Sequence, residues 1–260
     1  MKEITPKVYL IGYTVVDFEG ISQYLLDIKQ SDWESNADTE SDQLIEVAGR
    51  ICYRSWAPFD GTEGTNPNIT KVREDNKEYI QNIIKQSHGS VLEHSNVSLL
   101  FRDVSRVFTH EMVRHRAGMA YSQESLRYVR LDKLRFFIPE EIKQDPELYQ
   151  LYQKTVEHLE AVQETLSHKI KSGSTFHDKK VWTSRFRRLA PLGLATTILA
   201  TGNLRAWRHI VNMRSSAGAE EEIRMVMDQV VPILKHISPS VFDDLNKIDG
   251  VWKYELNAKP

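Results

Sequence analysis

The order of strand-like and helix-like segments restricts the fold of this chain more than any other feature. Runs rich in β-branched and aromatic residues predict strands, and apolar residues spaced three or four positions apart predict helices. Strands are predicted at 7–14, 97–101, 135–138 and 195–201, and helices at 41–54, 77–86, 105–114, 146–168, 179–188, 204–211 and 223–234. Because the two kinds do not alternate strictly, the pattern favours a mixed α/β fold with more helix than strand over a doubly wound sheet.

Two segments between these elements are predicted to be loops. Residues 56–68 contain prolines and glycines that interrupt regular structure. Residues 117–128 have no clean period and mix hydroxyl groups with charges of both signs, so an ordered loop is expected there. In the helix at 41–54, Ile51 falls at the spacing of an inward-facing residue, and Cys52 beside it is expected to be a small core residue.

The charge balance and the single cysteine exclude several classes of protein. The chain has 34 lysines and arginines against 36 acidic residues, so it lacks the basic excess of proteins that coat long nucleic acids. One cysteine cannot form a disulfide within the chain, and the composition fits a reducing compartment. No signal peptide or long apolar run stands out, which predicts a soluble cytoplasmic protein. A glycine-rich dinucleotide fingerprint and a phosphate-binding loop are also absent from the sequence.

The densest group of chemically active side chains lies in residues 114–129. Arginines and a histidine stand there among hydroxyl, amide and carboxylate groups: Arg114, His115, Arg116, Ser122, Gln123, Glu124, Ser125 and Arg127. Arginine forks match phosphate oxygens and planar carbonyls. The segment could therefore hold a nucleotide without a glycine-rich cradle. Composition alone favours the alternative of a solvated, charged surface loop.

A second group lies in residues 203–216, which are predicted to be helical. Asn203 and Arg214 are 11 residues apart, close to three turns, so they share one face with Trp207 between them. His209 is predicted to point well away from Arg214. The stripe could line a cleft; alternatively, Trp207 belongs to the core and Arg214 forms an ion pair at its edge.

Two further segments offer candidate ligands, each with an ordinary alternative. His88, Glu93 and His94 suggest a metal, but their spacing is not that of a zinc-binding helix, so no metal site is expected. Glu93 can instead orient a histidine.

Three arginines fan around the helix before Pro191: Arg185, Arg187 and Arg188. One of them could reach a ligand phosphate, or all three are surface charges.

Taken together, these segments resemble the flavin-dependent thymidylate synthases. That family is marked by Arg-His-Arg, a short spacer and Ser-x-Arg-Tyr, which read here as Arg114-His115-Arg116 and Ser125-Leu126-Arg127-Tyr128. The surroundings also match: RICYRSW at 50–56, HGSVLEH at 88–94, THEMVRHR at 109–116 and TGNLRAWRHIVNMR at 201–214. Because the similarity runs in order from about residue 44 to about residue 244, it is far more specific than any one block.

The resemblance implies a single domain over residues 1–260, helix-rich α+β with a central, mostly antiparallel sheet. It also implies a homotetramer with active sites shared between subunits, and no nucleic-acid or membrane partner. FAD is the implied cofactor, and its contacts carried over by position are His88, Ser90, Glu93, Arg114, His115, Arg116, Asn203 and His209. The implied dUMP contacts are Gln123, Ser125, Arg127, Arg187 and Arg214.

The implied reaction is the reductive methylation of dUMP to dTMP, with NADPH and 5,10-methylenetetrahydrofolate as co-substrates and no cysteine nucleophile. Uracil C5 is a poor nucleophile, and arginines around the ring favour its electron-rich form by stabilising negative charge on the oxygens. Arg214 and Ser125 are the expected catalytic residues, Arg214 at the ring and Ser125 as a hydrogen-bonding positioner. Arg127 and Arg187 are expected at the phosphate or the ring edge.

The chain departs from the family pattern at two places. The spacer 117–124 is one residue longer than usual, which predicts a bulge near Ala117-Gly118 and leaves open whether Ser122 or Ser125 faces the uracil. Gly218 stands where the family often has a histidine.

These departures keep two alternative functions open. One is a related flavin-dependent enzyme that methylates or hydroxymethylates C5 of another pyrimidine nucleotide. The other is a non-catalytic nucleotide-binding or RNA-binding protein that stacks bases on Tyr121 and Tyr128 beside the arginines.

Overall fold

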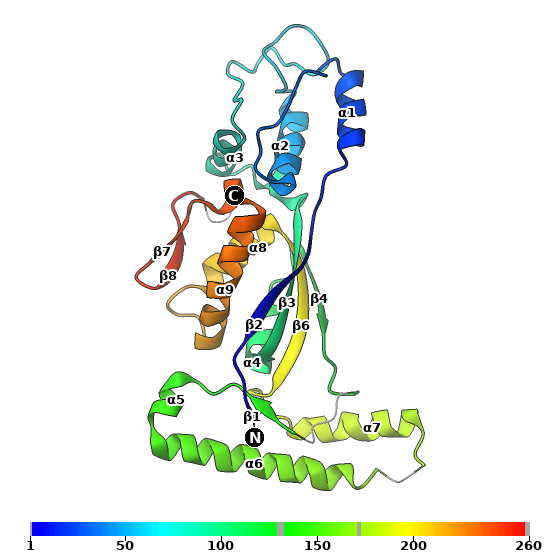
Figure 1. Cartoon of the computed structure of the whole chain (residues 1–260), viewed down its shortest axis with the longest axis vertical. Helices are drawn as coiled ribbons and strands as arrows, with labels where there is room; N and C mark the ends of the chain where they lie inside the picture. The colour runs from blue at the N-terminus through cyan, green and yellow to red at the C-terminus, as the bar shows by residue number, and fades with distance from the viewer. Residues whose placement is uncertain (1, 129–132, 171–172, 258–260) are drawn as a thin grey trace.

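The computed structural model describes residues 2–128, 133–170 and 173–257. A four-stranded antiparallel sheet in the order β2-β3-β6-β4 forms its centre (Figure 1). The strands are β2 (Lys7–Tyr13), β3 (Asn96–Ser105), β6 (Ala195–Asn203) and β4 (Met119–Gln123). The predicted mixed fold with a mostly antiparallel sheet is confirmed.

Helices cover one face of this sheet and form the main core with it. They are α4 (Arg106–Met112), α8 (Leu204–Arg214) and α9 (Glu221–Ile237). Val97, Leu99 and Phe101 of β3 are fully buried, because alternate residues of a strand point to the same face. Trp207 of α8 is also fully buried, and its Nε1 donates to the Val97 carbonyl at 3.2 Å. Of the two readings of Trp207, the core residue is therefore the one observed.

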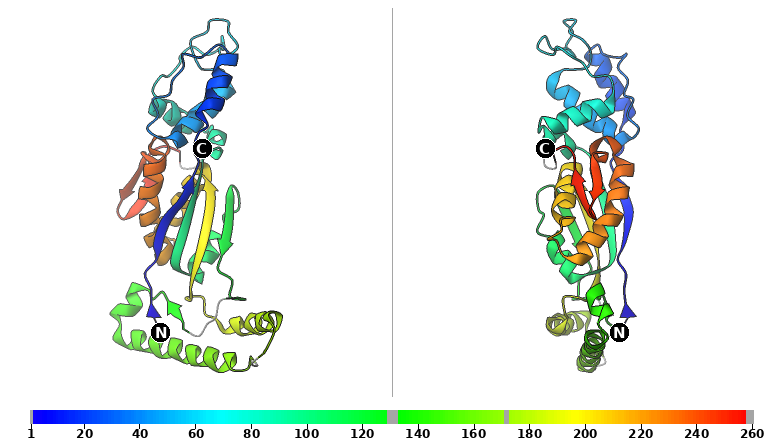
Figure 2. Two further views of the ribbon diagram at one scale, coloured as in Figure 1. Left: turned by 45° about the vertical axis from the view of Figure 1, so that its right-hand side comes forward. Right: turned by 90° about the vertical axis from the view of Figure 1, so that its left-hand side faces the viewer.

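The opposite face of the sheet has no helix over it in the described part of the chain (Figure 2). Paired residues cross this face from one edge strand to the other: Tyr9, Leu100, Leu199 and Ser122. Tyr9 is 40% exposed, Ser122 is exposed, and the two leucines are only partly buried. Exposed apolar surface of this extent commonly marks a site of protein association.

Helical units lie at opposite ends of the sheet (Figure 1). One unit contains α1 (Phe18–Asp27), α2 (Glu40–Tyr53), α3 (Asn76–Lys85) and the short η1 (Gly89–Glu93). The other contains α5 (Glu140–Gln144), α6 (Pro146–Ser167), α7 (Phe176–Phe186) and η2 (Arg187–Leu189). Beside the second unit, β1 (Lys2–Glu3) pairs in parallel with β5 (Arg135–Phe136).

The C-terminal elements lie beside α8 and α9. They are α10 (Pro239–Phe242) and an antiparallel hairpin of β7 (Leu245–Ile248) and β8 (Val251–Tyr254). Over the described ranges, none of the helices combines the length and the apolar character that crossing a membrane requires.

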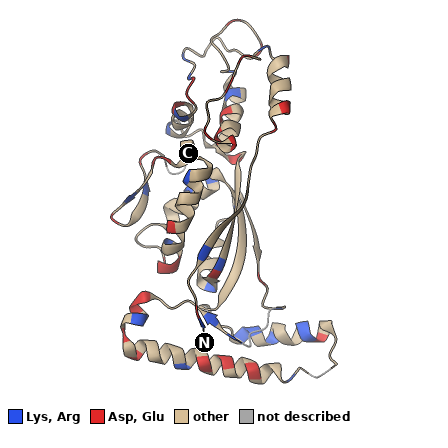
Figure 3. Cartoon of the chain, viewed as in Figure 1, with Lys and Arg blue, Asp and Glu red and all other residues tan. Residues whose placement is uncertain are grey.

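Charge is divided between the two long helices of the lower unit (Figure 3). Helix α6 carries many acidic residues, whereas α7 and η2 carry a basic series: Lys179, Lys180, Arg185, Arg187 and Arg188. The end of the sheet nearest α7 is therefore flanked by positive charge, which suits an anionic ligand.

The structure corrects the loop predicted at 117–128. Residues Met119–Gln123 form the edge strand β4, with Met119 paired to Gly202 and Gln123 to Ile198. The polar composition of this strand hid it, because an edge strand with one solvated face does not need a continuous apolar run. Helix α1 and the β7–β8 hairpin were not predicted.

The expected burial of Ile51 and Cys52 is also wrong. Ile51 is 48% exposed and Cys52 is exposed, although both lie in the predicted helix α2. The buried side of α2 is lined partly by charged residues instead: Asp42, Glu46 and Arg50 are almost fully buried, and Arg50 pairs with Glu46. Near the end of this helix, the spacing of apolar residues therefore predicted burial on a side that is exposed.

Candidate functional site

Helix α4 is the element around which the predicted site residues gather. Ser105 at the end of β3 caps it, since the Ser105 Oγ accepts from the Phe108 amide at 3.1 Å. The carboxylate of Glu222, from α9, accepts in turn from the Ser105 amide at 2.6 Å and from its hydroxyl. Burial raises the pKa of Glu222 to about 7. This junction fixes Arg106 at one end of α4 and Glu111 in its last turn.

Arg214, the last residue of α8, docks onto the end of α4. Its Nη2 donates to the Glu111 carbonyl at 3.0 Å, and its Nη1 pairs with the Glu111 carboxylate. Its Nε donates to Nε2 of His115 at 2.8 Å. The side chain is 14% exposed, so most of it is buried by these contacts.

His115 is held in its neutral form by these surroundings. Burial, together with the nearby positive charges of Arg214, His209 and Arg114, lowers the pKa of His115 to about 4. An Nε2 that accepts from Arg214 must be unprotonated, so the geometry requires the same state. The ring of His209 also contacts His115, edge to face at 5.4 Å between centroids. His115 therefore contacts both Arg214 and His209.

Strand β4 directs its side chains alternately toward α4 and toward the open face of the sheet. The Tyr121 hydroxyl lies 2.8 Å from the Met112 carbonyl and 2.9 Å from the His115 carbonyl. Gln123 Nε2 donates to the Thr109 hydroxyl at 3.1 Å. Ser122 lies between these two residues in the strand and shares the open face with Leu199.

Ser125 follows the end of β4 rather than lying within it. Its Oγ accepts from the Arg127 amide at 3.3 Å. Arg127 is exposed, and its guanidinium lies 5.9 Å from the centre of the Tyr128 ring. Because Gln123 contacts α4 and neighbouring residues of a strand point to opposite faces, Ser122 points away from α4, whereas Ser125 lies beyond the strand.

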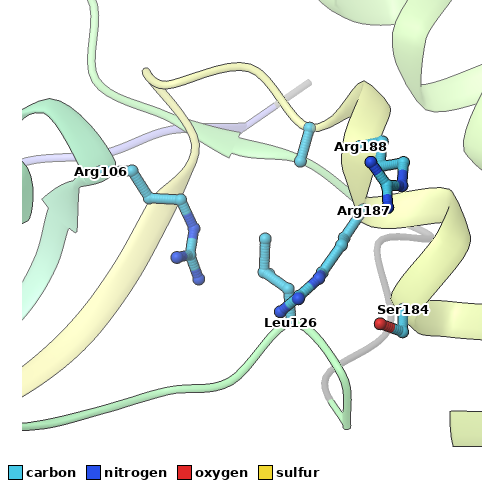
Figure 4. A pocket seen from close by; sticks show the side chains of 6 residues that line it. Arg106, Leu126, Ser184, Arg187 and Arg188 are labelled. Carbon is cyan, nitrogen blue, oxygen red and sulfur yellow. The ribbon is translucent and has the colours of Figure 1, made fainter.

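A cavity of about 360 Å³ lies at the N-terminal end of α4, lined by Arg106, Leu126, Ser184, Arg187, Arg188 and Ala190. Arg106 reaches toward it from one side and Arg187 from the other, with Leu126 between them (Figure 4). Burial lowers the pKa of Arg106, and the nearby positive charge of Arg187 lowers it further. Nη2 of Arg106 donates to the Glu124 carbonyl at 3.2 Å, and its buried Nε has no hydrogen-bond partner among the described residues.

Other predicted flavin contacts gather at the far end of the sheet, around η1 and the start of α8. Nδ1 of His88 lies 2.6 Å from the Tyr53 hydroxyl, and Glu93 pairs with Arg205 at 2.7 Å. Ser90 of η1 is exposed. The alternative in which Glu93 orients a histidine is not what the structure has, because its carboxylate faces Arg205.

Asn203 joins this group to the segment after α4. Its side-chain oxygen caps α8 by accepting from the Ala206 backbone amide at 2.8 Å. The backbone amide of Asn203 donates to the Gly118 carbonyl at 3.1 Å. Gly118 has a φ of +69°, and a Cβ there would lie 2.4 Å from Asn203 Nδ2. Gly118 therefore makes a left-handed turn directly before β4, which pairs without irregularity; the bulge expected from the extra spacer residue stays a prediction.

The structure brings the predicted residues together in three places rather than one. Arg114, His115, Arg116, His209 and Arg214 lie around the end of α4, the two flanking arginines exposed. Arg187 lies at the cavity with Ser125 and Arg127 in the adjacent loop, and His88, Ser90, Glu93 and Asn203 lie at the far end. Gly218 has open space around it. No cluster of metal-ligating residues occurs within the described ranges.

Sequence reasoning missed Glu111 and Arg106 as parts of this site. One local signal existed: Glu111 lies three residues before Arg114, and the two side chains form an ion pair at 3.8 Å. Their partners, however, are distant in the chain: Glu111 meets Arg214, and Arg106 meets Arg187 only through the cavity. No local pattern indicates such contacts.

Comparison with known proteins places this geometry in a family context. The family model described as thymidylate synthase complementing protein matches residues 35–240. The flavin-dependent thymidylate synthase of Mycobacteroides abscessus is 35% identical over 222 residues, covering 83% of each chain. Those of Mycobacterium leprae and Corynebacterium diphtheriae are 36% and 34% identical, each over 82% of both chains.

A solved structure shares the fold at much lower sequence identity. It is a UMP/dUMP methylase, PolB from Streptomyces cacaoi, bound with 5-Br dUMP. The TM-score is 0.60 with 16% identity, and the match covers 94% of this chain and 96% of that one. At this identity the match supports the fold alone.

Proposed function

The chain belongs to the flavin-dependent thymidylate synthase family, and from that premise we propose that it converts dUMP to dTMP by reductive methylation. The proposed cofactor is FAD, the carbon donor is 5,10-methylenetetrahydrofolate, and NADPH supplies the reducing equivalents. Residues 1–260 are proposed to act as one domain.

One observation carries the substrate proposal: α4 connects an arginine-lined cavity to the guanidinium of Arg214. Arg106 and Glu111 are five residues apart on the helix, a rise of about 7.5 Å. An anion in the cavity and a ring beside Arg214 would therefore be separated by roughly the length of one nucleoside monophosphate. This arrangement supports a small phosphorylated nucleotide over a long nucleic acid.

At the phosphate end, the cavity offers guanidinium groups from two elements together with a hydroxyl. Arg106 comes from α4, Arg187 comes from η2, and Ser184 from α7 lines the same space. Guanidinium forks bind phosphate oxygens in pairs, and each additional fork also fixes the orientation of the ligand. Arg127 is proposed to close the site from the loop that follows β4.

At the base end, Arg214 is proposed to stabilise negative charge on the uracil oxygens. A preorganised cation at that position favours the electron-rich ring whose C5 can attack carbon. Gln123 and Ser125 are proposed to hydrogen-bond the nucleotide, with Ser125 as a positioner. Cys52 is on α2, away from α4, which agrees with a mechanism that uses no cysteine nucleophile.

The predicted flavin contacts fit a diphosphate-containing cofactor by charge and exposure. Arg114 is 71% exposed and Arg116 is exposed, so both guanidinium groups are accessible to phosphate oxygens. His88 and Ser90 are exposed as well. A bound reduced flavin would supply the hydride. The protein's own part is to hold the cofactor with Arg114, Arg116, His115 and His209 beside the base end of the nucleotide.

A homotetramer with shared active sites is proposed on two grounds. His88 and Ser90 lie at the far end of the sheet from the cavity, whereas Arg114 and Arg116 lie around the end of α4. A single subunit therefore does not surround a cofactor that contacts both pairs of residues. The sheet also leaves the row from Tyr9 to Leu199 without a covering helix in the described chain. A neighbouring subunit on that face would bury the row and supply the missing side of the site.

The proposal is tested by assaying dTMP formation with purified full-length protein, FAD, NADPH and 5,10-methylenetetrahydrofolate. Turnover with dUMP is expected, with UMP and dCMP run in parallel and NADH compared with NADPH. Arg214→Ala should lower turnover by about 100-fold, the usual cost of removing one preorganised charge-stabilising donor. Arg224→Ala, which removes an exposed arginine of α9, is the matched control and should leave turnover unchanged.

Other outcomes would contradict a part of the proposal or identify a different function. Normal dTMP formation by Arg214→Ala would refute the role given to that residue. Preferred turnover of UMP or dCMP would identify a related pyrimidine C5-methylase. A colourless preparation that binds RNA and forms no product would identify a binding protein.

A further inference from the structure

A second cavity, of about 570 Å³, lies next to the arginine-lined cavity and is called the apolar cavity below. Helix α6 supplies one wall with Tyr152, Val156 and Leu159, and Phe136 and Phe137 supply another. Cavities of this size with mainly apolar walls are typical of sites that bind small organic molecules.

The opening of the apolar cavity is lined by apolar side chains that water reaches. Leu151 of α6 is 61% exposed, and Leu192, which precedes β6, is 57% exposed. Phe136 and Val156, in contrast, are buried. A ligand with an apolar body would remove the exposed leucines from water, and burial of such surface favours binding.

The charged residues that line the apolar cavity, among those the structure describes, are two glutamates, Glu220 and Glu222. The carboxylate of Glu222 holds Ser105, and that of Glu220 accepts from the Ile223 amide at 3.3 Å at the start of α9. Burial raises the pKa of both carboxyl groups, that of Glu222 to about 7. A ligand cation beside them would offset the loss of water around these carboxylates, whereas a ligand anion would be repelled.

The apolar cavity and the arginine-lined cavity share a wall of two bonded segments. The Arg106 amide donates to the Leu194 carbonyl and the Val107 amide to the Leu192 carbonyl, both at 3.1 Å. Along the first segment, Ser105 lines the apolar cavity and Arg106 the other one. A ligand in one cavity therefore contacts the backbone that carries the walls of the other.

We propose that the apolar cavity is a binding site for a small, mainly apolar molecule with one positively charged amine, and that its occupancy strengthens nucleotide binding in the arginine-lined cavity. The amine lies beside Glu220 and Glu222, and the apolar body packs against α6. A positive charge behind the shared wall favours an anion on its other side. The first part is independent of the proposed function; the second rests on it, because it takes the arginine-lined cavity as the phosphate end of the dUMP site.

A matched pair of probes tests the ligand chemistry. Naphthylethylamine is a cation at neutral pH, and naphthylpropionate carries the same ring and linker with a carboxylate. In titration calorimetry with the flavin-loaded full-length protein, the amine should bind roughly tenfold or more tightly than the carboxylate, because like charges at a contact are strongly disfavoured. Saturating amine should increase dUMP affinity by about fivefold, and saturating dUMP should increase amine affinity by the same factor.

Variants of the lining residues locate the probe. Thr155→Phe places a ring in the apolar cavity from an exposed position of α6 and should weaken amine binding by roughly tenfold or more. Glu220→Gln keeps an acceptor for the Ile223 amide but removes a charge, so it should reduce the preference for the amine over the carboxylate. Glu157→Gln removes an exposed charge from α6 outside the cavity and is the control, with probe affinities unchanged. Circular dichroism and flavin content check that each variant is folded.

Several results would overturn the inference. Equal affinities for the two probes would remove the charge preference, and amine binding that Thr155→Phe leaves intact would place the amine elsewhere. If neither probe binds and Thr155→Phe lowers the mass of the assembly, a second copy of the chain occupies the cavity. Amine binding with unchanged dUMP affinity would refute the coupling alone. A protein that binds the amine but no dUMP would refute the proposed function and leave the amine site standing.

Discussion

The hydrogen bond from Arg214 Nε to His115 Nε2 ties a proton position to a side-chain geometry. A protonated His115 would carry a hydrogen on Nε2 and could not accept from Arg214. Because burial and neighbouring cations lower its pKa to about 4, the ring is neutral at ordinary pH. At the scale of single residues, the site therefore combines one fixed cation with one neutral acceptor, and the Glu111 carboxylate balances the charge.

Glu222 is the residue whose titration should be visible in the stability of the protein. Its folded pKa, about 7, lies above the unfolded value of 4.5, so the folded state binds more protons between these limits. Its contribution to stability is fully present below the unfolded value and is lost as pH rises through the folded value. The hydrogen bonds that hold Ser105, the N-cap of α4, depend on this carboxyl group.

We expect Glu222→Gln to become more stable relative to wild type as pH rises from 5 to 8. The relative gain should be about 2 kcal/mol, because a shift of one pKa unit corresponds to about 1.4 kcal/mol. Urea unfolding of both proteins at the two pH values measures it. A pH-independent difference for Glu222→Gln would contradict the assignment.

At the scale of elements, the junction between β4 and α8 depends on one glycine. Gly118 adopts a left-handed φ of +69° directly before β4, and its carbonyl accepts from the amide of Asn203, the N-cap of α8. The space that a Cβ would occupy is filled by the Asn203 side chain. A side chain at this position would therefore displace the N-cap of α8.

Gly118→Ala should destabilise the protein by about 2 kcal/mol, through left-handed strain and displacement of the Asn203 cap. Thermal or urea unfolding measures this loss. Gly218→Ala is the matched control: a Cβ there meets no atom within 4 Å, and the residue has no left-handed φ, so the change should be within about 0.5 kcal/mol. Equal stabilities of the two variants would show that Gly118 is not required.

At the scale of the whole molecule, the described residues place helices over one face of the sheet and none over the other. Leu100 and Leu199 lie side by side at the middle of the uncovered face, on the two central strands. The proposed assembly would place another subunit there. The helical unit of α5 to α7 lies at one end of the sheet and leaves this face free (Figure 2).

Leu199→Lys should therefore shift the protein to smaller species in size-exclusion chromatography with light scattering. Burying an unpaired lysine in a subunit contact is costly, so dissociation is expected even at micromolar concentration. Flavin content should fall in parallel, since the cofactor site is proposed to be shared. Leu151→Lys alters a leucine of α6 that is 61% exposed and should leave the mass unchanged. A wild-type monomer would contradict the assembly.

The amino-acid sequence determined most of the elements and the family. Apolar spacing predicted α2, α3, α6, α8 and α9 and the strands β2, β3 and β6, because these patterns reflect which side of a short segment is buried. It failed at β4, whose strand state depends on pairing with β6, and at Ile51 and Cys52, where a buried ion pair replaces apolar packing. Local patterns do not contain those partners.

Only the tertiary structure decided which side chains meet. Arg214 is 99 residues from His115 and 103 from Glu111, and packing of α8 and α4 on one face of the sheet brings the three into contact. Arg106 and Arg187 line one cavity for the same reason. Hydrogen bonds and ion pairs act over a few ångströms, so chain distance gives no information about them until the core has placed the helices that carry them.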